Sequence, residues 1–269
     1  MTAAPRPVDV LVIGGGQAGL AVGYYLRRAK ADYERRYDLP VLRLVTVHAV
    51  RRGDGRLLVE TGHGTWQAKA VISATGTWWR PYILPRYPGL RDFGGEHLHT
   101  AGYRGPEPLR GKRVVIVGGG NSAAQLLAEL STLAEVTWVT QRPPSLLPDE
   151  VDGRALFDLA TRRHRAGQTG EQAESIADLG DIVAVPPVRE ARGRGALKAE
   201  PMFTRITPRG VAWADGSTLA CDVILWCTGF RPALSHLAPL RLRGPGGLIP
   251  TRGTQAVGEP RLHLLGYGD

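Results

Sequence analysis

The sequence predicts an α/β fold of two similar halves, each built on a parallel β-sheet that carries an antiparallel β-meander insertion. Two observations support this prediction. A short apolar strand runs into a glycine-rich turn and then into a helical pattern at Gly14–Gly19, and the same succession recurs at Gly118–Ala123. In each half a later apolar strand ends in Thr-Gly, at Thr75-Gly76 and at Thr228-Gly229. Such a repeat indicates one supersecondary unit used twice.

The first half begins with a strand at residues 8–13 (Val-Asp-Val-Leu-Val-Ile), which we expect to be short and buried, as parallel strands covered on both faces are. A helix is predicted from Leu20 to about Tyr37, before Pro40. Residues 57–61 and 66–74 are separated by turn signals and predict the antiparallel meander.

The second half repeats this order. Residues 114–117 predict a second buried strand, 122–133 a helix and 136–140 the next strand. A further helix is expected at 157–166, and a hairpin leads into a last buried strand at 219–227. A final short strand is predicted at 262–265, so the chain returns to the first half.

The two glycine turns match the Gly-x-Gly-x-x-Gly fingerprint of Rossmann-like dinucleotide-binding domains. The first glycine allows a tight turn and the second lets the backbone approach a pyrophosphate. The third, replaced by Ala123 in the second copy, lets helix and strand pack closely. Phosphate oxygens then meet N–H groups at the helix N-terminus. Because both matches lie between a predicted strand and a predicted helix, we expect two such domains.

The residue at the end of the strand that follows the helix indicates whether such a domain binds NAD or NADP. In the second half this position holds Gln141-Arg142 and no acid. An acid suits the ribose 2′-hydroxyl of NAD, whereas an arginine suits the 2′-phosphate of NADP. Arg142 is therefore predicted to select NADP, the alternative being a solvated surface arginine. In the first half, residues 35–40 hold no acid-tipped strand where one is expected, about 20 residues beyond the turn.

Composition excludes several other classes of function. The formal net charge of +9 comes without any lysine-arginine run or recognition motif, so no nucleic-acid partner is expected. No apolar stretch is long enough to span a bilayer and no signal core precedes the first strand, which predicts a cytoplasmic protein. Cys221 and Cys227 are predicted to be buried and unpaired. His97 and His99 lack a nearby third ligand, so no metal site is expected.

The segment between the two fingerprints resembles a known family. Phe93-x-Gly95-x-x-x-His99-x-x-x-Tyr103 is similar to the pattern of class B flavin-dependent monooxygenases, which are flavin-containing monooxygenase-like NAD(P)/FAD-binding oxidoreductases. The two Thr-Gly strand ends, Asn121-Ser122 and Gly268-Asp269 also resemble family positions. His99 is expected to be a structural link within this signature.

The resemblance implies FAD at the first fingerprint and NADP(H) at the second. NADPH would pass a hydride to the flavin, which would then activate O₂ as a C4a-(hydro)peroxide and oxygenate a small molecule. It implies an FAD-binding-type domain at 1–105 plus 232–269 and an NADP-binding domain at 106–231, and it names no catalytic side chain. The predicted cofactor-binding residues are Gly14, Gly16, Gln17, Gly19, Thr75, Gly76, Asp269, Gly118, Gly120, Asn121, Ser122, Arg142, Thr228 and Gly229.

The chain departs from the family pattern twice, both times in the FAD half. Relatives carry several tens of residues after the position of Lys30, including the strand with the ribose-binding acid, and a closing helix beyond the position of Asp269. We therefore expect an incomplete FAD-type domain. Two alternatives to a monooxygenase stay open. One is an NADP-binding remnant or sensor with a defective flavin site, and the other is a pyridine-nucleotide reductase without oxygenase activity.

Overall fold

The structure is a computed structural model that describes residues 4–15, 19, 40–77, 80–83, 87–151 and 182–266. The chain divides into two compact units. Unit 1 comprises Met1–Arg80 and Phe230–Asp269, and unit 2 comprises Pro81–Gly229. Each unit contains a sheet with parallel strand pairs, and antiparallel strands accompany it, so the predicted fold class is confirmed.

Unit 2 is built on a five-stranded, fully parallel sheet with strand order β5-β12-β6-β7-β8. The order changes direction at β6, because the chain moves from β6 to β7 on one side while β12 pairs on the other. Ligands of open α/β sheets bind at the carboxyl ends of the strands at such a point. The strands are β5 (Glu96–His99), β6 (Arg113–Val117), β7 (Glu135–Thr140), β8 (Ala199–Pro201) and β12 (Val223–Trp226).

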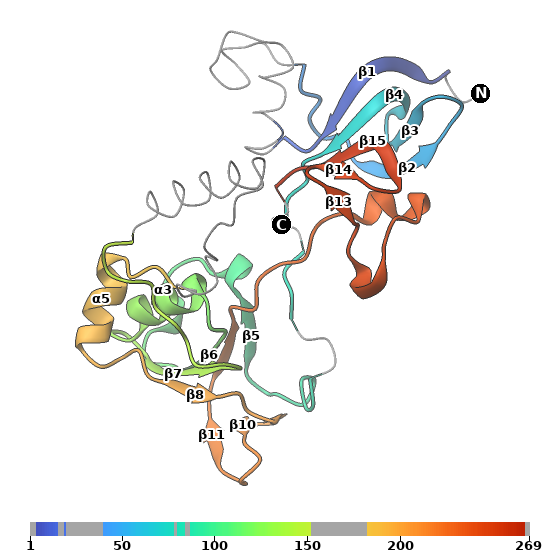
Figure 1. The fold of residues 1–269 in the computed structure, drawn as a ribbon. Coiled ribbons are helices and arrows are strands. Elements are labelled where there is room, and N and C mark those ends of the chain that lie inside the picture. Colours follow the sequence, from blue (N-terminus) through green and yellow to red (C-terminus); the bar gives the residue numbers. More distant parts are fainter. Residues whose placement is uncertain are drawn as a thin grey trace. The chain divides into compact units, whose positions relative to one another are not determined.

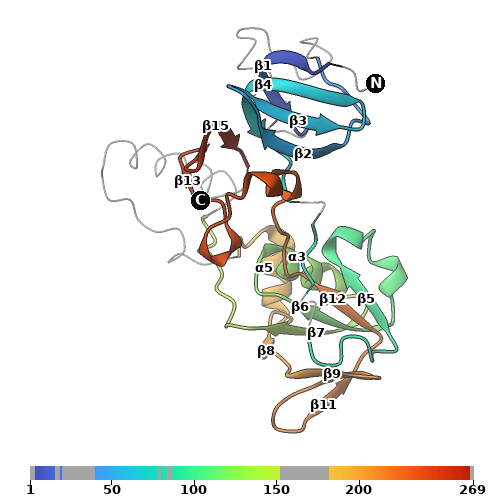
Figure 2. The same cartoon turned by 90° about the vertical axis from the view of Figure 1, so that its right-hand side faces the viewer.

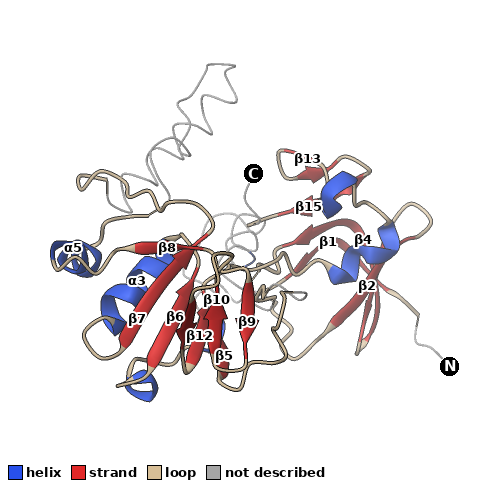
Figure 3. Cartoon of the chain, turned by 90° about the horizontal axis from the view of Figure 1, so that it is seen from below, coloured by secondary structure: helices blue, strands red, loops and turns tan. Residues whose placement is uncertain are grey.

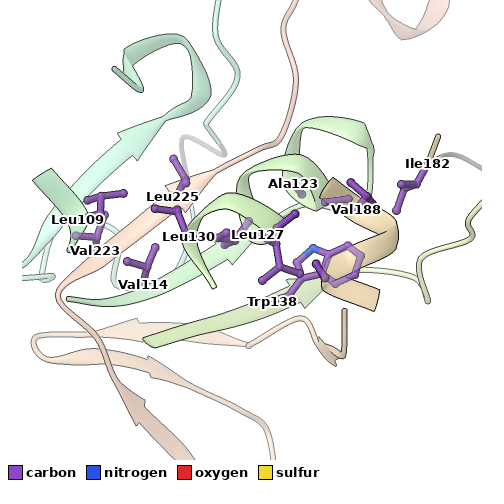
Figure 4. Close-up of a cluster of buried hydrophobic side chains, with 14 residues drawn as sticks. Leu109, Val114, Ala123, Leu127, Leu130, Trp138, Ile182, Val188, Val223 and Leu225 are labelled. Carbon is purple, nitrogen blue, oxygen red and sulfur yellow. The ribbon is translucent and has the colours of Figure 1, made fainter. Parts of the chain in front are cut away.

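Both faces of this sheet are covered, as a parallel sheet requires. Helices α3 (Asn121–Leu130) and α5 (Pro186–Gly193) lie on one face (Figure 3). Alternate residues of β6, such as Val114 and Ile116, contribute to the apolar cluster beneath them (Figure 4). The intervening residues join a second cluster with the small antiparallel sheet of β9 (Arg205–Thr207), β10 (Gly210–Ala212) and β11 (Thr218–Ala220) on the other face (Figure 2).

The segment before β6 belongs to unit 2. It contains β5 and the short 3₁₀ helices η1 (Thr100–Gly102) and η2 (Glu107–Leu109). The sequence placed the boundary between residues 105 and 106, but β5 pairs along its whole length with β12. The two helices predicted at 20–37 and 157–166 lie outside the described residues.

Unit 1 is organised by β4 (Gly64–Ser73), a ten-residue strand (Figure 1). Strand β1 (Arg6–Ile13) pairs with it in parallel along one edge. On the other edge, β3 (Leu57–Thr61) pairs antiparallel with its first half and β15 (Glu259–Leu264) parallel with its end. The predicted meander and the predicted final strand are thus both present. The remaining elements are β2 (Val47–Arg52), β13 (Thr251–Arg252), β14 (Gln255–Ala256), η4 (Ser235–Leu240) and η5 (Pro245–Gly247).

The expectation that residues 8–13 form a buried strand is wrong. Ile13 is the only buried residue of β1, and Val10 is 38% exposed. The corresponding strand of unit 2, β6, is buried at four of its five residues because both faces of its sheet are covered by apolar clusters. Among the described strands β1 pairs with β4 alone, which leaves it at the edge of the sheet. Residues 35–39, where the sequence shows no acid-tipped strand, lie outside the described residues.

A buried carboxylate joins three parts of unit 1. Glu259 at the start of β15 has a side chain that is only 3% exposed, and both of its oxygens are paired with arginines. Arg261 Nε lies 2.7 Å from one oxygen and Arg52 Nε lies 2.9 Å from the other. Arg52 also donates to the carbonyls of Leu240 and Gly258. The carboxylate therefore fixes β2 and the end of η4 against β15.

Replacing this carboxylate should cost measurable stability. Glu259→Gln removes the charge that balances two arginines, so we expect a loss of about 2 kcal/mol in the free energy of unfolding. Glu60→Gln is a matched control, because Glu60 forms a single exposed ion pair with Arg51 and should change stability by no more than about 0.5 kcal/mol. Chemical denaturation of both variants measures the difference, and equal losses would contradict the role given to Glu259.

Candidate functional site: two glycine turns

The glycine turn of unit 2 is packed against the end of the neighbouring strand. Gly118 follows β6 with a φ of +138°, and a Cβ built on it would lie 2.3 Å from the carbonyl oxygen of Cys227. Its N–H donates to Val139 O at 3.0 Å, and its carbonyl accepts a 2.7 Å bond from the indole N–H of Trp138. Only glycine combines this conformation with this approach. The position of the turn is therefore fixed by the contact with the end of β12 and by the hydrogen bonds to β7.

The next part of the turn opens toward free space. A Cβ on Gly120 would meet no atom within 4 Å, although this glycine is the N-cap of α3. The N-cap residue makes no side-chain capping bond, and Ser122 in the first turn is exposed. Ala123, at the third fingerprint position, is fully buried and lets the helix lie close to the sheet. The arrangement leaves room for a phosphate where helix N–H groups are available, so these residues fit a dinucleotide.

Two further predicted residues stand around this turn. The side-chain oxygen of Asn121 accepts a 2.8 Å bond from the backbone N–H of Val183, which holds the segment before α5 near the start of α3. Arg142 follows the end of β7, is exposed, and makes no ion pair with any described residue. Arg142 thus lies just beyond the end of β7, and its role in selecting NADP stays a prediction.

Unit 1 repeats the geometry of the first glycine. Gly14 follows β1 with a φ of +114°, and a Cβ on it would lie 2.3 Å from the carbonyl oxygen of Ala74. A Cβ on Gly19 would lie 1.9 Å from the oxygen of Gly14. Both glycines are therefore required by the turn itself, and the described part of this turn also fits a dinucleotide. Gly16, Gln17 and Asp269 lie outside the described residues.

In both units the neighbouring strand ends in Thr-Gly beside the glycine turn. Ala74 precedes Thr75-Gly76, and Cys227 precedes Thr228-Gly229, so the same contact brings each pair to the carboxyl end of its sheet. The hydroxyls of both threonines donate to backbone carbonyls of the protein, Thr75 to Ala233 and Thr228 to Tyr82. Sequence reasoning missed these two partners, because each is a backbone group about 150 residues away in the chain.

The signature between the fingerprints has a structural role in unit 2. His99 Nδ1 accepts a 3.1 Å bond from Ala101 N, so Nε2 carries the proton and donates to Gly229 O at 3.0 Å. Desolvation lowers the pKa of this imidazole, which favours the neutral form that the two bonds require. A Cβ on Gly95 would lie 2.4 Å from the oxygen of Asp222. His99 thus links β5 to the second Thr-Gly pair, as expected.

The described residues offer few other reactive groups. Burial raises the pKa of the Cys227 thiol to about 12 and that of Cys221 to about 11, so both are held as thiols, and both are free. Among the described residues, no group of three or more His, Cys, Asp or Glu side chains could hold a metal ion. No helix in the described ranges is long and apolar enough to cross a membrane.

Comparison with known proteins agrees with this architecture. A family model described as pyridine nucleotide-disulphide oxidoreductase matches residues 25–152. A flavin-containing monooxygenase from Stenotrophomonas maltophilia is 41% identical, and the match covers 98% of this chain and 91% of that chain with a TM-score of 0.84. These matches place the chain in the class of oxidoreductases. More particularly, this chain belongs to the family of flavin-containing monooxygenases, within the class B flavin monooxygenases.

More distant relatives share the fold. A cyclohexanone monooxygenase from Rhodococcus sp. Phi1, solved with NADP⁺, is 17% identical over 97% of this chain and 80% of its own, with a TM-score of 0.60. An uncharacterized CzcO-like oxidoreductase from Geobacillus kaustophilus is 26% identical over 321 residues, covering 96% of this chain and 90% of the relative. That aligned span is longer than the 269 residues here, so the relative carries residues within it that this chain lacks.

The two glycines of the second turn should respond differently to alanine. Gly118→Ala places a Cβ against the Cys227 carbonyl at a positive φ, so we expect a loss of about 2–4 kcal/mol in the free energy of unfolding. Gly120→Ala meets no atom and keeps an extended backbone, so stability should stay within about 0.5 kcal/mol of the parent protein. Thermal and chemical unfolding of the two variants measure this contrast. A stable Gly118→Ala protein would show that the turn does not depend on this contact.

Proposed function

We propose that this chain is an NADPH- and FAD-dependent monooxygenase-type oxidoreductase that acts on a small molecule. The observation that carries the proposal is the pair of matching glycine turns, each packed through a positive-φ glycine against the end of the strand that carries Thr-Gly. A single such turn is a weak signal, but two in one chain suit an enzyme that holds two dinucleotides. The family of the chain supports the same reading.

In this proposal the second turn holds NADP(H). Backbone N–H groups at the start of α3 meet the pyrophosphate, the open space over Gly120 admits it, and Arg142 pairs with the 2′-phosphate. The first turn holds FAD in the same way, with Gly14 and Gly19 shaping the turn. When bound, FAD supplies the redox chemistry, accepting a hydride from NADPH and then activating O₂ for oxygen transfer. The described residues hold and orient the nucleotides.

One observation favours a second candidate, an NADP-binding protein that no longer turns over. Strand β1, which leads into the FAD turn, lacks a second neighbour among the described strands and is largely exposed. The corresponding strand β6 in unit 2 is flanked on both sides. Unit 1 would therefore bind the adenosine part of its dinucleotide more weakly than unit 2 does.

Flavin content separates the two candidates. We expect the purified protein to show flavin absorption bands after FAD is added, at close to one flavin per chain, and to oxidise NADPH in air with consumption of O₂. The visible spectrum and an oxygen electrode measure both. A protein that FAD cannot restore to a flavin spectrum, yet binds NADP⁺, would establish the second candidate and overturn the first.

The preference for NADPH should depend on one side chain. Arg142→Ala removes the charge opposite the 2′-phosphate, so the Kd for NADPH should rise roughly 10-fold or more while that for NADH changes little. Gln141→Ala, at the neighbouring position, serves as a control. Titration of each variant with both nucleotides measures the ratio, and equal losses for NADPH and NADH would refute the role of Arg142.

A further inference from the structure

The carbonyl of Gly118, in the glycine turn of unit 2, is bonded to a tryptophan side chain. Trp138 Nε1 donates to Gly118 O at 2.7 Å. The N–H of Gly118 donates to the backbone carbonyl of Val139, the next residue of the same strand, at 3.0 Å. Both polar groups of this glycine are therefore held by consecutive residues of β7, one through its side chain and the other through its backbone.

Packing fixes the position of the indole. Trp138 is only 1% exposed and belongs to the apolar cluster beneath α3 and α5, together with Leu127 and Val188 (Figure 4). A buried indole N–H without an acceptor costs free energy, so buried tryptophans are normally hydrogen-bonded. Here the acceptor is the carbonyl of the turn. The ring could not rotate away without losing this bond and disturbing a close-packed core.

The bond also sets the direction of the next N–H group along the turn. Among the described residues no peptide bond is cis. In a planar trans peptide the C=O and the N–H point in opposite directions. Because the Gly118 carbonyl points toward the Trp138 indole, the Gly119 N–H points away from it. No described group accepts a hydrogen bond from this N–H, so it is available to a ligand at the turn.

We propose that Trp138 is a positioning residue for the nucleotide of unit 2. Its indole holds the Gly118 peptide so that the Gly119 N–H faces the pyrophosphate before the nucleotide arrives. This inference rests on the proposed function, because it takes the second turn to be a nucleotide site. A donor that is already oriented needs no ordering at the moment of binding, so the bond raises affinity although the buried indole is not itself a ligand contact.

The role of Trp138 differs from the role proposed for Arg142. NADPH and NADH share the pyrophosphate, whereas only NADPH carries the 2′-phosphate that Arg142 would bind. Trp138 therefore contributes to the affinity for both nucleotides, and Arg142 discriminates between them. The two roles predict different patterns of loss when each side chain is replaced.

Replacement of the indole tests this role. Trp138→Phe keeps an aromatic ring in the core but removes the N–H donor, so the Kd values for NADPH and NADH should both rise roughly 5-fold or more. Trp226→Phe is a matched control, because Trp226 is fully buried in β12 of the same sheet and its indole donates to His97 Nδ1 at 3.2 Å. The control loses a similar buried bond and should leave both Kd values within about 2-fold of the parent protein.

Titration of both variants with both nucleotides gives outcomes that separate this inference from the proposed function. Unchanged affinities in Trp138→Phe, or a loss for NADPH alone, would overturn the role of Trp138. Equal losses in Trp138→Phe and Trp226→Phe would also overturn it, because they would show a general loss of order. A parent protein that binds neither nucleotide would contradict the proposed function, and the positioning role with it.

The hydrogen bond itself is measured in the nucleotide-free parent protein, so this test does not depend on the folding of a variant. With ¹⁵N-labelled tryptophan, the assigned indole N–H signal of Trp138 should lie downfield of the signal of free indole in water, because a strong hydrogen bond deshields the proton. A signal at the position of free indole would show that the bond to Gly118 is absent and would overturn the proposal.

Discussion

The architecture of both units depends on a backbone contact that only glycine permits. Gly118 passes so close to the end of β12 that any Cβ would overlap the Cys227 carbonyl, and Gly14 passes equally close to Ala74 at the end of β4. Each contact fixes the turn and the Thr-Gly strand end beside it, and in unit 2 it also fixes the start of α3. A Cβ on Gly120, further along the second turn, would meet no atom within 4 Å.

Much of the fold could be predicted because apolar runs and glycine turns are local signals. The pattern of residues 114–117 predicted a buried strand, and β6 is one, since apolar clusters cover both of its faces. The similar pattern of residues 8–13 gave a wrong prediction of burial. An apolar run shows that a strand is suited to a covered sheet, but it does not show whether the sheet is covered at that strand. The sequence shows no acid-tipped strand at residues 35–40, whereas the exposure of β1 is visible only in the structure.

The parts that the sequence could not predict are contacts between distant backbone groups. Ala233 and Tyr82 accept these hydrogen bonds through their backbone carbonyls. Because every residue carries a carbonyl, the residue type at these positions gives no signal of the bond. The pairing of Arg52 with Glu259 spans 207 residues and is no more visible than the other ion pairs of a basic chain. The Thr-Gly pairs were noticed as a repeat, yet their hydrogen-bonding role followed only from the structure. The repeat in the sequence indicates where a structural motif occurs twice, and the structure shows which hydrogen bonds form it.

The two units therefore carry the same strand-turn motif with different burial. The strand that leads into the second turn, β6, is mostly buried, and the strand that leads into the first turn, β1, is mostly exposed. The most direct measurement of this account is a crystal structure of the chain with NADP⁺. The account predicts the pyrophosphate over Gly120 at the N-terminus of α3, with the 2′-phosphate beside Arg142. A nucleotide bound elsewhere, or one whose pyrophosphate does not contact the turn that begins at Gly118, would contradict it.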